Sequence, residues 1–416
     1  MDAQAGNWPS AESRLRNALA VLGSPEHVSS VQARRRWRME LDRVYRRLTE
    51  TLIRANRPKD AFETWQDFLR ADSLLLGNAR ENAGSFPDRA VSLTFAHLDG
   101  RYATWRRIDG RLDFAWSTAD SAEIDQLARG YSALCGWESS RASDIIGVGG
   151  NLVQALGVFM TDLPSGRQII IQPDGELARI PWSALPLSSG VLVADRAMPV
   201  ISPLSLDRAR RDLHRGIRRV LAIGADFFSP VRARDVRPLP SLNEELAAVR
   251  SLGSDVVVLR GADATAVRIE RELAKASVLH FAGHALGTAD GVSLLTAPDA
   301  FAKSDDTDLW QPSLKLCGSL SLAVFSACST GKYEEVDTVA PQNLAHQFLL
   351  AGTPQVIATL WNVDSRATTE FMKELYAGLR AGASTASALQ AAARLVRSKP
   401  EWRHPFYWAG FTLFGS

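Results

Sequence analysis

The sequence predicts an α/β protein with a mostly parallel sheet flanked by helices and an all-helical segment at the N-terminus. From Ser10 to Gly77, apolar residues recur every three or four positions, which is typical of amphipathic helices. From Arg167 onward, short runs of Val, Ile and Leu alternate with helix-like stretches, which favours parallel strands joined by helices. Two of the apolar runs stop at His284 and Cys328.

The helical segment is expected to cover residues 1–85. Ala61–Trp65 has the spacing of the second half of a tetratricopeptide repeat. One such unit cannot form a solenoid, because about three units are needed to bury a continuous core. We therefore interpret the segment either as a helical cap or as a surface on which a partner docks.

The stretch that follows is predicted to begin with a β-meander. Leu98-Asp99-Gly100 separates the apolar runs 91–95 and 102–105 and predicts a hairpin, and 112–116 extends it. A helix is expected over 122–134. The glycines at 147–150 lack the third glycine of a dinucleotide-binding loop, so no cofactor is expected there.

The remaining elements alternate between strands and helices. Asp364 is placed to cap a helix through Phe371 and Leu375, and a second helix is expected over 386–396. The predicted strands are 168–172, 220–223, 256–259, 278–281, 322–325, 356–360 and 407–414.

Composition excludes several classes of protein. The 416 residues are 46% hydrophobic and 23% charged, with a net charge of +2, which gives no electrostatic case for nucleic acid. The basic run Arg34–Arg38 is followed by Glu40 and Asp42, so we interpret it as a solvated helix face, with a docking surface as the alternative. The three cysteines are widely spaced, which argues for a reducing compartment, and no run approaches a membrane span. A cytoplasmic location is expected, without contact with a membrane.

His284 and Cys328 have the chemistry of a cysteine protease. Carboxyl ends of parallel strands meet at one edge of a sheet, and a His about 50 residues before a Cys is the caspase arrangement. An imidazole favours the thiolate and then protonates the leaving amine, so Cys328 is the expected nucleophile and His284 the acid/base. The backbone amides of Cys328 and Ala285 are the expected oxyanion donors.

The other histidine and cysteines of this region are expected to be structural. His280 lies four residues before His284 on the same strand, roughly 13 Å away, and is interpreted as a core residue or a support for the site. Phe281 follows it instead of the Glu of a paired-His zinc protease, so no metal is expected. Cys135 and Cys317 are interpreted as small core residues.

These residues together resemble the CHAT family of caspase-like proteases, which are relatives of separase and the caspases. The landmarks are Ile169–Leu177, Ile180–Leu185, Leu239–Glu245, the runs ending at His284 and Cys328, Phe348–Gly352, Trp361–Asp364 and His404–Phe411. The resemblance implies an inactive caspase-like half, assigned to residues 86–235, followed by a catalytic half over residues 236–416. It also implies a cysteine endopeptidase with a His284–Cys328 dyad and no cofactor.

The resemblance further implies protein partners: a substrate such as a pore-former encoded nearby, and an upstream activator or sensor, in a prokaryotic defence or cell-death system. Glu334, Glu335 and Asp337 are candidates to line the pocket for a basic substrate residue. Ala285 stands where the family usually has Gly, and a requirement for positive φ there would displace its amide. That departure and the helical N-terminus keep open an alternative function, a catalytically silent scaffold for protein–protein interaction.

Overall fold

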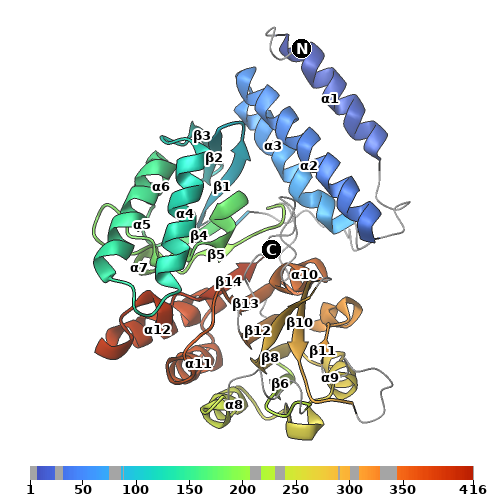
Figure 1. Cartoon of the computed structure of the whole chain (residues 1–416), viewed down its shortest axis with the longest axis vertical. Coiled ribbons are helices and arrows are strands. Elements are labelled where there is room, and N and C mark those ends of the chain that lie inside the picture. Colours follow the sequence, from blue (N-terminus) through green and yellow to red (C-terminus); the bar gives the residue numbers. More distant parts are fainter. Residues whose placement is uncertain are drawn as a thin grey trace.

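The computed structural model describes residues 7–23, 31–74, 86–87, 89–206, 217–229, 239–288, 291–299, 309–327 and 344–415. Their strands form an 11-stranded sheet in the order β3-β2-β1-β4-β5-β14-β13-β12-β8-β6-β7, and a 3-stranded sheet in the order β11-β10-β9 (Figure 1). Helices flank the large sheet. The predicted fold class, a mostly parallel sheet between helices with a helical N-terminus, is confirmed.

The strands and helices have the following bounds. The strands are β1 Ala90–Leu98, β2 Arg101–Ile108, β3 Arg111–Trp116, β4 Gln168–Gln172, β5 Val200–Ile201, β6 Val220–Gly224, β7 Val256–Arg260, β8 Val278–Gly283, β9 Ala285–Thr288, β10 Gly291–Leu295, β11 Leu309–Trp310, β12 Leu322–Ala327, β13 Gln355–Thr359 and β14 Phe411–Gly415. The α-helices are α1 Trp8–Leu22, α2 Val31–Arg54, α3 Pro58–Leu74, α4 Ser121–Cys135, α5 Ala142–Leu156, α6 Val158–Thr161, α7 Val193–Arg196, α8 Leu242–Arg250, α9 Ala266–Leu273, α10 Leu344–Leu350, α11 Ser365–Arg380 and α12 Thr385–Ser398.

The direction of the strands changes once in the middle of the large sheet. β6, β7, β8, β12 and β13 are parallel to one another, and β14 is antiparallel to β13. β14, β5, β4 and β1 are again parallel. The carboxyl ends of the two groups therefore lie at opposite edges of the sheet. We call the edge with the carboxyl ends of β6, β7, β8, β12 and β13 the His284 edge.

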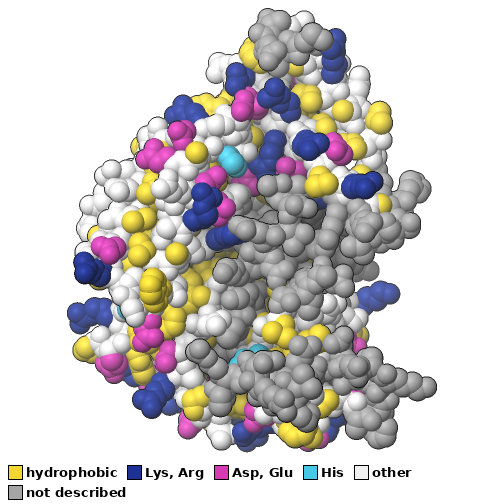
Figure 2. All heavy atoms as spheres, in the orientation of Figure 1, with side chains coloured by type: hydrophobic (Ala, Val, Ile, Leu, Met, Phe, Trp, Pro, Cys, Tyr) yellow, Lys and Arg dark blue, Asp and Glu magenta, His cyan; other side chains and the backbone are white. Residues whose placement is uncertain are grey.

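The three N-terminal helices form a layer beside β1 and β2 (Figure 1). Phe62 and Trp65 of α3 are buried in one cluster with Trp105 of β2, whose indole nitrogen donates to the carbonyl of Pro58 at 2.8 Å. On the face shown in Figure 2, basic and acidic side chains alternate over these helices, as expected for a solvated surface. The helices of this segment thus pack against the sheet through an aromatic cluster, while the choice between a cap and a docking surface stays a prediction.

The meander was predicted correctly. β1 and β2 pair antiparallel up to Leu98 and Arg101, and β3 continues the ladder. Gly100 adopts a φ of +74°, a conformation that a glycine reaches without the steric cost of a Cβ. The hairpin and the third strand therefore follow from the turn residues and the apolar runs alone.

Two features differ from the prediction. β14 begins at Phe411 instead of 407, since Pro405–Tyr407 forms a 3₁₀ turn whose Phe406 carbonyl accepts a hydrogen bond from Trp361. β6 precedes residue 235 but pairs with β7 and β8. We therefore propose that the boundary between the two halves lies before β6. The rest of the three-part division stays a prediction.

Across the ranges that the structure describes, no helix combines the length and the apolar character that a membrane span needs.

Candidate active site

The candidate site is built on two neighbouring strands, β8 and β12. They are parallel, and Gly283 at the end of β8 pairs with Ala327 at the end of β12. His284 follows Gly283 directly. Cys328 follows Ala327 in the sequence, but Cys328 and the pocket candidates Glu334, Glu335 and Asp337 lie outside the described residues. The expectation that both apolar runs are adjacent parallel strands ending at one edge is confirmed.

The end of β12 is fixed by its other neighbour. The hydroxyl of Thr359, at the end of β13, donates a hydrogen bond to the carbonyl of Ala327. Both residues are buried, so this bond satisfies a polar group that water cannot reach. The last described residue before Cys328 is therefore held from both sides of its strand.

His284 is half-buried and packs against an aromatic ring. The centroid of its imidazole lies 5.7 Å from that of Phe228, with an interplanar angle of 66°. Its carbonyl accepts a hydrogen bond from the amide of Leu295 at 2.9 Å. Phe228 belongs to the segment after β6, so a neighbouring strand end supplies one wall for the imidazole.

Gly283 leaves no space for a side chain immediately before His284. A Cβ at this position would lie 2.8 Å from the ring of Phe281 and 2.9 Å from the Cβ of Ala225. Both distances are shorter than real carbon contacts, and both neighbours are buried. The bend from β8 into His284 therefore depends on glycine for packing reasons.

Ala285 begins β9 and carries no left-handed strain. The non-glycine residues with positive φ in the described chain are Asn56 and Asp109, so the backbone of Ala285 is in an ordinary region. The alanine thus fits where the family usually has glycine, without the conformational cost considered above.

His280 lies in the core, as the sequence indicated. It is fully buried, with Nδ1 2.7 Å from the hydroxyl of Tyr376 on α11 and Nε2 3.3 Å from Oε1 of Glu245 on α8. Burial, together with the charge of Glu245, raises the pKa of Tyr376 well above its usual value. The phenol therefore stays protonated at neutral pH, and its hydroxyl lies within hydrogen-bond distance of Nδ1 of His280. This cluster joins β8 to two helices beneath the His284 edge.

A family model described as the CHAT domain matches residues 148–416, well over half of the chain. The chain belongs to the CHAT family.

Two curated relatives of this CHAT chain are tetratricopeptide repeat protein 28 of Homo sapiens, 26% identical over 309 residues, and that of Mus musculus, 27% identical over 312 residues. Each match covers 62% of this chain and 12% of the relative, so the chain spans about an eighth of the relatives' length. A crystal structure of the Saccharomyces cerevisiae separase–securin complex superposes with a TM-score of 0.62 at 10% identity, covering 98% of this chain and 37% of that chain. The fold is that of the caspase-like cysteine proteases.

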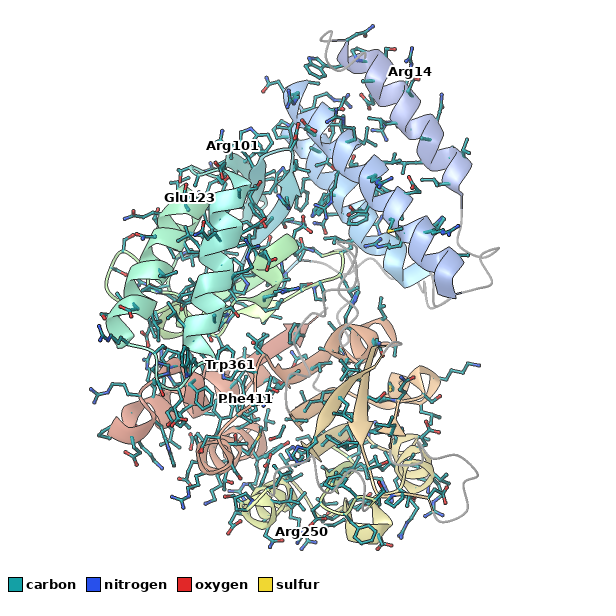
Figure 3. The ribbon with its side chains drawn as sticks, viewed as in Figure 1. Arg14, Arg101, Glu123, Arg250, Trp361 and Phe411 are labelled. Atoms are coloured by element: carbon teal, nitrogen blue, oxygen red, sulfur yellow. The ribbon has the colours of Figure 1, made fainter. Side chains whose placement is uncertain are left out.

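The family motifs near the C-terminus stabilise the connection between β13 and β14 through a hydrogen bond and close packing. The indole nitrogen of Trp361 donates to the carbonyl of Phe406 at 2.9 Å, and a Cβ on Gly410 would lie 3.0 Å from the same indole. Trp361 and Phe411 are labelled at this junction in Figure 3. Asp364 accepts hydrogen bonds from the amides of Arg366 and Ala367 and caps α11, as predicted. These CHAT motifs are therefore structural.

The remaining cysteines of the CHAT chain are unsuited to nucleophilic chemistry. Cys135 and Cys317 are fully buried, and burial raises the pKa of each thiol to about 12. At neutral pH both stay protonated, which confirms the interpretation of both as core residues. Within the described ranges, no cluster of three or more His, Cys, Asp or Glu could hold a metal ion.

Phe228 was missed by the sequence analysis. It contacts His284 from a segment far away in the sequence, and its neighbours carry no motif. Only the pairing of β6 with β8, which places Gly224 beside Ala282, brings the two rings together.

Proposed function

We propose that this chain is a cysteine endopeptidase in which Cys328 is the nucleophile and His284 the acid/base. The observation that carries the proposal is the pairing of Gly283 with Ala327, because His284 and Cys328 are the next residues in the sequence. The CHAT family match and the caspase-like fold support the same chemistry.

The reaction follows from the residue types. His284 takes the thiol proton, and the Cys328 sulfur attacks the scissile carbonyl carbon. The carbonyl oxygen becomes an oxyanion that the amides of Ala285 and Cys328 stabilise. His284 then protonates the leaving amine, and a water deprotonated by the same imidazole releases the acyl group. Phe228 supports this role because an apolar wall limits the orientations of the imidazole.

The backbone of Ala285 is suited to the oxyanion role. In an antiparallel ladder, residues alternate between facing the partner strand and facing away from it. The carbonyl of His284 accepts from Leu295 on the β10 side, so the amide of Ala285 is turned away from β10. The alternative function is a silent scaffold for protein–protein interaction, which alanine at this position and the helical N-terminus motivated; the ordinary backbone of Ala285 supports the peptidase proposal because the residue carries no left-handed strain.

The substrate is proposed to be a specific partner protein, and a second protein is proposed to switch the enzyme on. Glu334, Glu335 and Asp337 are the proposed pocket residues for a basic side chain. The proposed setting, a cytoplasmic prokaryotic defence or cell-death system, rests on the family resemblance alone, and the curated relatives above are mammalian.

Cleavage of proteins encoded nearby tests the proposal. Wild-type, Cys328→Ala and His284→Ala chains are incubated with each candidate, and fragments are identified by mass spectrometry. Cys317→Ala is the matched control, because it removes a buried thiol elsewhere. We expect fragments from the wild type and the control and none from the Cys328 variant. Identical fragments from wild type and Cys328→Ala would refute the assignment.

A further inference from the structure

The small sheet has an outer edge that begins one residue after His284. β10 lies in its centre, with β11 on one side and β9 on the other. Along β9, Ala285 pairs with Leu294, Leu286 with Ser293, Gly287 with Val292 and Thr288 with Gly291. Among the strands that the structure describes, none pairs with the second side of β9.

The register fixes which backbone groups of β9 face this outer edge. The amide of Leu295 donates to the carbonyl of His284, so His284 and Leu295 form a hydrogen-bonded pair. Every second residue shares that orientation in an antiparallel ladder, which turns Leu286 and Thr288 toward β10. The N–H and C=O groups of Ala285 and Gly287 therefore point away from β10, along the outer edge.

We propose that the outer edge of β9 binds an extended segment of the polypeptide substrate by strand addition, through the backbone of Ala285 and Gly287. This inference rests on the proposed peptidase function. An edge strand presents unpaired donors and acceptors to which an extended chain can add. Strand addition on β9 brings a peptide past His284, because the first outward residue, Ala285, is its neighbour in the chain.

The residue types suit this role. A peptide in this position directs one carbonyl at the amide of Ala285, the proposed oxyanion donor. Its next backbone groups along the chain form hydrogen bonds with Gly287. Glycine at position 287 carries no side chain that could hinder a second backbone. Main-chain hydrogen bonds supply affinity for many sequences, so side-chain selectivity falls to other parts of the site.

A matched pair of variants distinguishes the contribution of the outer edge of β9 from a general effect on folding. Gly287→Pro removes the outward N–H and places a ring on the outer edge, while the inward bonds of Leu286 and Thr288 to β10 remain. Gly287→Ala keeps the N–H. The probe is a library of peptides from a digested cell lysate, and mass spectrometry records the cuts that disappear in Cys328→Ala. Folding is checked by thermal unfolding, and thiol reactivity by the rate of Cys328 alkylation with iodoacetamide.

We expect Gly287→Pro to slow these cuts about 10-fold or more, because the substrate loses one to two main-chain hydrogen bonds to β9. Gly287→Ala should stay near the wild-type rate, and iodoacetamide should alkylate all three chains equally. If Gly287→Pro cuts as fast as the wild type, while Cys328→Ala does not cut, the edge inference is wrong and the peptidase function stands. The proteins encoded nearby are added to the library as candidate activators, because a second protein is proposed to switch the enzyme on. A library without any Cys328-dependent cut in their presence contradicts the peptidase function and, with it, this inference.

A scan with N-methylated peptides keeps the inference testable if Gly287→Pro does not fold. One good substrate from the library is methylated at each backbone nitrogen in turn and given to the wild type. Strand addition predicts that every second methyl group slows cleavage, because alternate amides face β9. A uniform effect along the peptide would overturn the proposal.

Discussion

The two edges of the large sheet carry the same kind of strand end but are used differently. At the His284 edge, β8 ends in Gly283 and an imidazole that is only half-buried. At the opposite edge, β4 ends in Gln172 and is followed by Asp174, and α2 and α3 cover both side chains. Gln66 of α3 donates to Gln172 at 2.8 Å, and Arg46 of α2 contacts Asp174 at 2.5 Å.

The charges at the covered edge are balanced within the protein. Burial alone would raise the pKa of Asp174, but the charge and hydrogen bonds of Arg46 outweigh it and hold the pKa below the usual value. Asp42 also pairs with Arg46, yet burial dominates there and raises its pKa. Among the described residues, the same architecture therefore gives an edge with buried, paired charges in one half and an edge with a half-buried imidazole in the other.

Removing the cation of the covered edge should have the largest effect on stability. Arg46→Ala leaves Asp42 and Asp174 mostly buried without their partner, which should cost about 3 kcal/mol of unfolding free energy. Arg43→Ala, whose pair with Glu40 is exposed, is the control and should cost less than about 1 kcal/mol. Urea unfolding measures both. Equal losses would mean that the covered edge is not held by charge.

At the His284 edge, the sharpest packing constraint is at Gly283. Gly283→Ala forces a Cβ against Phe281 and Ala225 and should cost about 1–3 kcal/mol while displacing His284. Gly147→Ala is the control, because a Cβ there meets nothing within 4 Å and favours helix α5 by about 0.5–1 kcal/mol. Cleavage rates and unfolding curves are compared. A Gly283→Ala chain with full activity would contradict this account of the bend.

Phe228 should matter for activity more than for stability. Phe228→Ala removes the ring beside His284 and should lower kcat about 10-fold, in keeping with an aromatic contact of about 0.5–1.5 kcal/mol. Phe227, which is 49% exposed, provides the control in Phe227→Ala. Phe228→Leu should recover part of the rate, since it restores apolar volume. If both alanine variants act alike, Phe228 does not position the imidazole.

The smallest effect concerns the junction between the halves. His404 lies 3.0 Å from the hydroxyl of Ser140, and its Nδ1 accepts from the amide of Phe406. Burial lowers the pKa of His404 below 6.5. The unfolded chain therefore binds this proton more readily, so stability is complete above pH 6.5 and declines as the pH falls below it.

Thermal unfolding at pH 7.5 and pH 5.5 measures this dependence. Between pH 7.5 and pH 5.5, the melting temperature of the wild type should fall slightly more than that of His404→Asn, whose side chain does not titrate. The same loss in both chains would assign the acid sensitivity to other groups.

Long apolar runs made much of the fold predictable from the sequence. Short strands, and contacts between residues far apart in the sequence, were not predictable. The strands β8 and β12 are buried on both faces, and their continuous apolar runs made them predictable. On β8, for example, His280 packs against α8 and α11, while Phe281 packs toward Trp310. β9 to β11 are only two to five residues long and contain Gly287 and Gly291, which leaves no periodic signal. Phe228 reaches His284 through the order of strands in the sheet, and that order cannot be derived from local sequence.

The reactivity of Cys328 tests the central claim most directly, since that claim is the pairing of its thiol with His284. Wild-type and His284→Ala chains are treated with iodoacetamide at pH 7, and alkylation of each cysteine is followed by mass spectrometry. The account predicts that Cys328 reacts at least about 10-fold faster in the wild type, while Cys135 and Cys317 stay unmodified in the folded chain because they are buried. Equal rates for Cys328 in both chains would contradict it.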